Sequence, residues 1–173
     1  DLITIVDITN RKQAEKKLLN TTSQMQSIFK AFPDLVFILK PDGTLIDYKT
    51  GKESELFLPP EEFLGKRIHN VLPPDIVPLL ENAIQEAANT RTMTSVDYTL
   101  SMPRGEQVYE ARILPLLEDQ LIAVTRNITD QKRTEEALRE SEEKYRIIVE
   151  TALEGIWAID ADANTTFVNQ RMA

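Results

Sequence analysis

The sequence predicts an α+β fold, in which helices cover one face of a five-stranded antiparallel sheet and a long helix flanks the domain on each side. Three observations predict it. Five short segments have the apolar or alternating pattern of strands and are bounded by turn residues. One amphipathic helix falls between the second and the third of them. A stretch of sequence also recurs 120 residues later, and such a period indicates a domain-sized repeat.

The repeat joins DITNRKQAEKKL at 7–18 to NITDQKRTEEAL at 127–138 without a gap. The same shift places the segment 34–39, which contains the apolar run 35–39, on residues 154–159. The chain is therefore expected to hold one whole domain with a fragment of a neighbour on each side. The expected segments are the end of a preceding domain at 1–9, a linker helix at 10–32, the complete domain at 24–129, a second linker helix at 129–152 and the start of a following domain at 145–173.

The two linker helices carry the same apolar seam. Apolar residues follow spacings of four and three, which is the heptad pattern of a coiled coil. The seam residues are Leu18, Met25 and Ile28 in the first helix and Leu138, Tyr145 and Ile148 in the second. This recurrence favours a parallel homodimer. The alternative is that each helix packs along its own domain, because the seam is short and carries Thr21 or Ser141 at its middle.

The expected elements of the complete domain follow in order. A first hairpin turns at Pro41-Asp42-Gly43, and short helical turns fill 50–72. A second hairpin turns at Pro103-Arg104-Gly105-Glu106. The expected strands are 35–39, 44–48, 94–102, 107–114 and 120–127, and the helix at 75–89 should bury Ile76, Leu79, Leu80, Ala83, Ile84 and Ala87.

Composition excludes several classes of function. The 173 residues carry a net charge of −8 and no basic patch, so binding to nucleic acid is not expected. Cysteine is absent, which removes disulfides, thiolate metal sites and cysteine nucleophiles and fits a reducing compartment. No apolar run approaches a membrane span of roughly 18 residues. A cytoplasmic location without direct membrane contact is expected, while membrane attachment elsewhere in the parent protein stays open.

Four motifs together resemble the PAS domain family. They are the repeated DITNRKQAEKKL, the Asp34 to Gly43 segment with its Asp-Gly turn, Glu61 to Lys66 ahead of Val71-Leu72-Pro73, and Tyr-Glu-x-Arg-x-x-Pro at 109–115. The resemblance implies sensing and dimerisation without catalysis. The change would pass through the helix after the last strand to neighbouring PAS and output domains. Such arrays are similar to the input regions of sensor histidine kinases, and a diguanylate cyclase is the alternative output.

The resemblance also implies a signal junction where each last strand meets its helix. The junction residues are Asp7 and Thr9 in the first copy and Asn127 and Thr129 in the second. The family's usual Asp is replaced by Asn127. An asparagine keeps a hydrogen-bond acceptor but gives up charge pairing, so this junction is expected to be looser.

A ligand, if one binds, would lie between the sheet and its helices. Alternation along the strands and the helix face predict the wall residues Phe37, Leu39, Leu80, Ile84, Tyr109, Ala111, Ile113, Ala123 and Thr125. A filled core is the default for a packed domain and is the favoured reading over a pocket. The small-molecule receptor, in which dimerisation is incidental, stays as the rival.

No cofactor, metal site or catalytic residue is predicted. The family's haem-binding members use a histidine from the helix at 75–89, and the only histidine here, His69, lies before that helix. Flavin photochemistry through a cysteinyl adduct needs a cysteine that the chain lacks. An unknown small ligand is therefore the kind of ligand left open.

Overall fold

The computed structural model describes residues 9–31, 34–51, 53–117 and 119–172, and the chain divides into units at 1–128 and 129–173. In the first unit the elements agree closely with the predicted order. They are α1 (Thr9–Ala31), β1 (Leu35–Leu39), β2 (Leu45–Thr50), η1 (Glu53–Glu55), α2 (Pro60–Phe63), η2 (Ile68–Asn70), α3 (Val77–Thr90), β3 (Thr94–Met102), β4 (Gly105–Leu117) and β5 (Gln120–Asn127).

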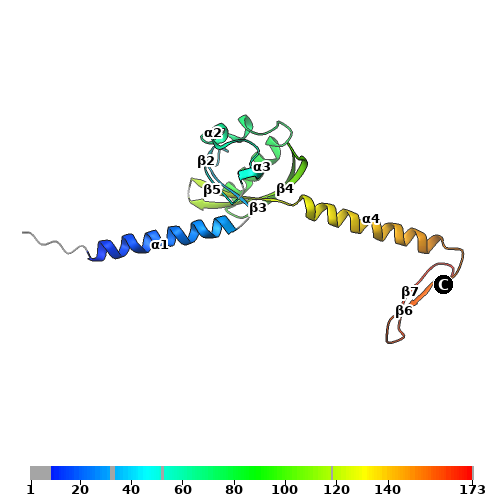
Figure 1. The fold of residues 1–173 in the computed structure, drawn as a ribbon. Helices are drawn as coiled ribbons and strands as arrows, with labels where there is room; N and C mark the ends of the chain where they lie inside the picture. The colour runs from blue at the N-terminus through cyan, green and yellow to red at the C-terminus, as the bar shows by residue number, and fades with distance from the viewer. Residues whose placement is uncertain (1–8, 32–33, 52, 118, 173) are drawn as a thin grey trace, which may run out of the picture. The chain divides into compact units, whose positions relative to one another are not determined.

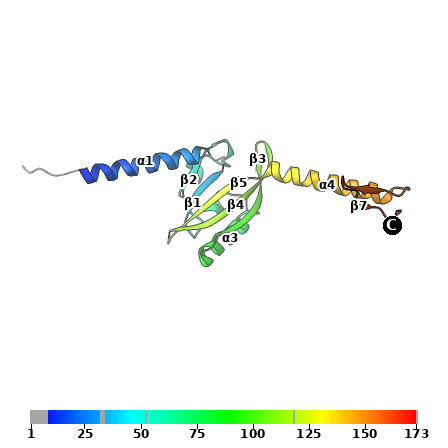
Figure 2. The same cartoon turned by 90° about the horizontal axis from the view of Figure 1, so that it is seen from below.

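The sheet confirms the predicted fold class. Its strands lie in the order β2-β1-β5-β4-β3, and every neighbouring pair is antiparallel (Figure 1). The last strand, β5, is therefore central and pairs with the first, β1. The sheet curves around α3, which lies against one of its faces (Figure 2).

The first hairpin shows why its turn has this sequence. The Asp42 carboxylate accepts a hydrogen bond from the Thr44 backbone N–H at 3.0 Å, which closes a short turn. Gly43 has a φ of +81°, and a Cβ there would come within 3.3 Å of the Ile68 side chain. Both the conformation and the close packing therefore require glycine. The second strand begins at Leu45 and continues to Thr50, two residues beyond the predicted end.

The helix α3 buries a slightly different face from the predicted one. Leu80, Ala83, Ile84 and Ala87 are buried as expected, and Val77 joins them. Leu79 is 43% exposed, so its predicted burial is wrong. Successive residues of a helix point about 100° apart, and the face centred between Leu80 and Ile84 turns Leu79 toward solvent.

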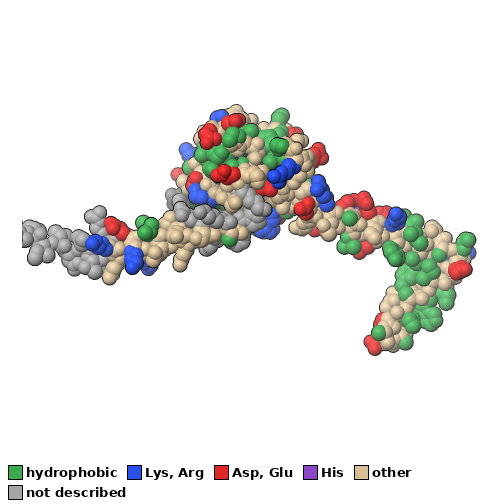
Figure 3. Space-filling model, viewed as in Figure 1, with side chains coloured by type: hydrophobic (Ala, Val, Ile, Leu, Met, Phe, Trp, Pro, Cys, Tyr) green, Lys and Arg blue, Asp and Glu red, His purple; other side chains and the backbone are tan. Residues whose placement is uncertain are grey.

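The long helices leave most of their side chains exposed. Every side chain that is described in α1 is exposed. The second unit begins with α4 (Thr129–Thr151), in which hydrophobic side chains stand among charged ones (Figure 3). Exposed apolar groups on a helix that does not cover a core are available for another partner.

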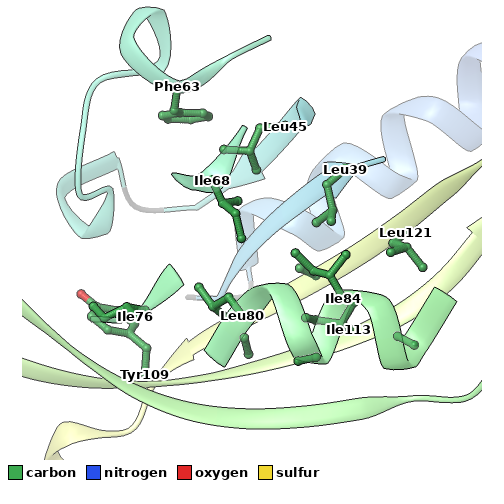
Figure 4. Close-up of a cluster of buried hydrophobic side chains, with 14 of the residues drawn as sticks. Leu39, Leu45, Phe63, Ile68, Ile76, Leu80, Ile84, Tyr109, Ile113 and Leu121 are labelled. Carbon is green, nitrogen blue, oxygen red and sulfur yellow. The ribbon is translucent and has the colours of Figure 1, made fainter. Parts of the chain in front are cut away.

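The core of the first unit lies between α3, the sheet and the segment 53–72. Its central residues include Leu39, Ile113 and Leu121 from the sheet and Leu80 and Ile84 from α3. Figure 4 shows Phe63 and Ile68 facing the same interior from the irregular segment. The Phe63 ring makes edge-to-face contacts with Phe37 at 5.8 Å and with Tyr48 at 5.4 Å between centroids.

The second unit repeats the first hairpin in register. Its strands β6 (Trp157–Ile159) and β7 (Thr165–Val168) pair Trp157 with Val168, as β1 and β2 pair Phe37 with Tyr48. Both hairpins shift register at the same step, after Ala158 and after Ile38. The sequence repeat at 120 is therefore also a structural repeat.

Replacing Leu80 with alanine should lower the free energy of unfolding by about 2–5 kcal/mol, because the change enlarges a cavity at a buried position. Its neighbour Leu79 provides a matched control on the same helix. The Leu79→Ala change should cost at most about 1 kcal/mol, because that side chain is already partly in water. Urea unfolding followed by circular dichroism measures both. Equal losses would contradict the helix face described above.

Candidate ligand cavity and output junction

An apolar cavity of about 100 Å³ lies inside the first unit. The interior thus differs from the filled core that the sequence favoured. The structure places eight predicted wall residues on it, namely Phe37, Leu39, Leu80, Tyr109, Ala111, Ile113, Ala123 and Thr125. Ile84 is buried but does not line it, because α3 carries that side chain into the packed part of the core.

Sequence reasoning missed the wall that the irregular segment provides. Leu56, Phe57, Leu58, Phe63, Ile68, Val71 and Leu72 all line the cavity. These residues lie in short helical turns with no sustained periodicity, so alternation cannot assign them a direction. The available signal for burial was the pair of apolar residues at 63–64 and the pair at 71–72, which lie between the prolines at 59–60 and 73–74.

Four polar side chains line the cavity, namely Glu55, Tyr98, Tyr109 and Thr125. Within the described part of the chain, its wall contains no Lys or Arg. The cavity is therefore an apolar space with a small polar region and without a positive charge. Such a site orients a ligand through few polar groups.

Tyr109 is the polar group with an unmet hydrogen bond. Its side chain is 2% exposed, and the hydroxyl has no hydrogen-bond partner of normal geometry among the described residues. Burial raises the pKa of Tyr109, and the nearby Glu55 carboxylate raises it further, so the phenol stays protonated and can donate. A buried hydroxyl without a partner costs about 1–3 kcal/mol.

Tyr98 stacks on Tyr109 across the β3–β4 pair, with ring centroids 5.8 Å apart. Burial raises the pKa of Tyr98 to about 12, and an interaction with the Thr125 hydroxyl opposes part of that rise. Tyr98 is therefore a neutral phenol under ordinary conditions. The hydroxyl of Tyr109 likewise interacts with Glu55 and Asn127, but it makes no hydrogen bond of normal geometry to a described residue.

Asn127 ends β5 and forms the junction with the next helix. Its side-chain amide donates hydrogen bonds to Glu55 Oε2 and Gln107 Oε1, both at 3.1 Å. The sequence interpretation considered only the acceptor of this asparagine, whereas the group that faces Glu55 is its donor. An aspartate here would place two carboxylates together. The second copy of the repeat has Asn127 where the first copy has Asp7, and this asparagine thus fits its surroundings.

The backbone after Asn127 is also held. The Ile128 N–H donates to the Val108 carbonyl at 2.8 Å, which extends the pairing of β5 with β4 by one residue. Thr129 is 4% exposed, so the first residue of α4 is buried. Asp7 lies outside the described residues, and the Thr9 side chain is likewise not described.

A second link holds the start of β1 to the end of β5. Asp34 is 8% exposed and accepts hydrogen bonds from Arg126 Nε at 3.0 and 3.2 Å and from Nη2 at 2.8 Å. The carboxylate raises the pKa of the Arg126 guanidinium, through these hydrogen bonds first and charge second. The fork geometry makes this a directional pair. The sequence showed Asp34 only as a strand-flanking residue.

The predicted seam residues that are described lie in solvent. Leu18 is 70% exposed, Leu138 60%, Tyr145 72% and Ile148 60%. The side chains of Met25 and Ile28 fall outside the described set.

The remaining candidate, His69, lies in η2 and is exposed, with its Nδ1 3.6 Å from Glu81 Oε1. That position belongs to the surface of the first unit. Among the described residues, no helix is both long enough and apolar enough to cross a membrane.

A curved antiparallel sheet, an apolar cavity under its helix-covered face and a central strand that leads into a long helix are the features of a PAS fold. The chain belongs to the PAS family. Residues 29–133 match the PAS fold, and residues 143–173 match a second PAS domain. The recognition from motifs is therefore confirmed.

Three similar proteins have been found by sequence or by structure. Sporulation kinase E of Bacillus subtilis is 22% identical over 149 residues, which cover 86% of this chain and 20% of the kinase. The chain thus spans about a fifth of that relative. The PAS domain of an HTR-like protein from Haloarcula marismortui has a TM-score of 0.51 and 22% identity, covering 68% of this chain and 99% of its own. A PAS domain from Colwellia psychrerythraea has a TM-score of 0.53 and 16% identity, covering 64% and 98%.

Replacing Asp34 with asparagine should lower the free energy of unfolding by about 1–2 kcal/mol, because a charge-assisted pair with a buried carboxylate is lost. The exposed Asp47–Lys49 pair is the matched control. Asp47→Asn should change stability by less than about 0.5 kcal/mol. Urea unfolding at neutral pH compares them, and an Asp34 effect no larger than the control would show that the pair does not hold the strands.

Replacing Asn127 with aspartate should destabilise the domain by about 1–2 kcal/mol at pH 7, because two donors are lost and a carboxylate faces Glu55. Neighbouring carboxylates raise each other's pKa in the folded state. The deficit should therefore be full above those raised values and shrink as pH falls toward about 4, the range of the unfolded chain. Unfolding curves from pH 7 to pH 4 measure the difference from the parent.

The double variant Asn127→Asp with Glu55→Gln is the control for that change. A glutamine amide at position 55 can donate to the new carboxylate, so stability should recover at pH 7. A deficit that neither acid nor this second change relieves would contradict the described contact.

Proposed function

We propose that this chain is a sensory input and dimerisation module that relays a change to an output domain through its linker helices. The observation that carries the proposal is the position of β5. This strand is central in the sheet, and only Ile128 separates its end from α4. A shift of the sheet would therefore act on the start of the helix without an intervening loop.

The exposed apolar seams support a parallel homodimer. Leu138, Tyr145 and Ile148 follow heptad spacing on α4 and are all more than half exposed. In a parallel dimer these residues would pack against their copies in the partner. Two helices that can pair in more than one arrangement form a bistable element, which a small change can bias.

The output domain that we propose is a histidine kinase, with a diguanylate cyclase as the alternative. The matched relative is a kinase, and this chain corresponds to 20% of it. Neighbouring PAS domains would then stand between the sensed change and the kinase. A cytoplasmic setting fits the absence of cysteine from the sequence.

The second candidate function is that of a small-molecule receptor. The specific observation in its favour is the cavity with the unpartnered Tyr109 hydroxyl. Glu55 lines that cavity and accepts the hydrogen bond from Asn127 at the junction. A ligand that moved Glu55 would therefore disturb the residue that precedes Ile128 and α4, so the two functions are compatible.

Replacing Leu138 with aspartate should weaken self-association at least tenfold, because a charge would be buried in the seam at each copy. Sedimentation velocity across a concentration series measures the dimer. Ile147 is the matched control, since it is 55% exposed on α4 but lies outside the heptad seam. Ile147→Asp adds the same charge and should leave the dimer largely unchanged. An unchanged Leu138 variant would contradict the seam.

Because the sequence contains no cysteine, an introduced cysteine can test whether the two helices of the dimer run parallel. A parallel dimer brings the two copies of position 138 together, so Leu138→Cys should form an intermolecular disulfide under mild oxidation. Ile147→Cys should cross-link much more slowly. Equal cross-linking at both positions would show that the seam does not define the interface.

A further inference from the structure

We propose that the cavity takes a small uncharged ligand with an apolar body and one hydrogen-bond acceptor, such as a ketone, which meets the Tyr109 hydroxyl, and that Glu55 excludes carboxylates. This inference rests on the receptor function proposed above. It names the chemical class of the ligand and the residue that selects it.

The size of the cavity limits the ligand. Its volume is about 100 Å³, and an apolar cavity of about 150 Å³ in another protein holds benzene. A ligand of roughly five to seven non-hydrogen atoms is therefore the expected scale. The walls are mainly Leu, Ile, Phe and Ala side chains, so most of that ligand must be apolar.

The Tyr109 hydroxyl supplies the polar contact. It is buried, lines the cavity and lies near Glu55 and Asn127, but it makes no hydrogen bond of normal geometry to a described residue. Figure 4 shows Tyr109 at one end of the buried cluster, which places the polar contact at an end of the site. A phenol can donate one hydrogen bond, so a carbonyl or ether oxygen at that end would complete its bonding.

Glu55 decides the charge of the ligand. Its carboxylate lines the same cavity, next to Tyr109, and is held there by the amide of Asn127 at 3.1 Å. A second carboxylate would meet this negative charge, and the described wall offers no cation to balance it. A carboxylate ligand is therefore disfavoured.

An amine is also disfavoured, although Glu55 would attract it. The ammonium group would have to leave water for a wall whose other polar groups are hydroxyls. Glu55 already accepts a hydrogen bond from Asn127, which reduces what it can offer to a cation. An ammonium group also loses more hydration than a ketone when it enters an apolar site.

Three probes of matched length test the proposal, namely hexan-2-one, hexanoate and hexylamine. Ligand-observed NMR titrations at pH 7 with the whole chain measure each affinity. The ketone should bind at least tenfold more tightly than the other two. Tyr109→Phe should weaken the ketone about three- to tenfold, the loss typical of one hydrogen bond. Glu55→Gln should let hexanoate bind and change the ketone little.

Ser95→Ala is the control variant, because Ser95 is exposed on β3 and does not line the cavity. Urea unfolding of each variant shows whether it is folded, and Glu55→Gln keeps the test valid if the tyrosine variant fails to fold. Hexanoate or hexylamine binding as tightly as the ketone to the unaltered protein would overturn the ligand class but leave the receptor function standing. Binding of none of the three would overturn the proposal, whereas cross-linking at position 138 tests the proposed dimer independently.

Discussion

The pairing of β1 with β5 is the constraint on which the rest of the structure depends. It joins Leu35 to Thr125 across 90 positions of sequence and places the last strand at the centre of the sheet. The Asp34–Arg126 pair lies at the same end of these strands and secures them with a charge-assisted fork. The chain thus enters and leaves the sheet on adjacent strands, so the segment after α1 and the segment before α4 share one support.

The cavity follows from what covers the sheet. The helix α3 packs its small and branched side chains closely on β3, β4 and β5. The other part of the cover is the segment 53–72, which consists of short turns and cannot present a continuous ridge of side chains. Dense packing depends on side chains that interdigitate over a regular surface. The space remains where the irregular cover meets the sheet, and Glu55 and Tyr109 lie on its wall.

Local patterns account for what the sequence predicted well. Alternation placed residues such as Ile113 and Ala123 inside, and turn residues marked both hairpins. The errors concern neighbours that are distant in sequence. The amide of Asn127 had to be read with Glu55, 72 positions earlier, and Asp34 with Arg126, 92 positions later. A pattern along the chain holds no information on such contacts, which depend on how the sheet closes.

The two copies of the repeat share their backbone register but differ in the side chains that secure it. Both hairpins have the same pairing and the same register shift, since the alternation of their strands is shared. In the second unit Asn169 is fully buried and donates to the Val149 and Glu154 carbonyls, which ties the hairpin to the last turn of α4. The corresponding position in the first copy is Lys49, which is exposed and reaches Asp47 instead. The first copy uses Asp34 and Arg126 to hold its sheet. Register is therefore a property of the repeated pattern, whereas the connection between each helix and its sheet is specific to each copy.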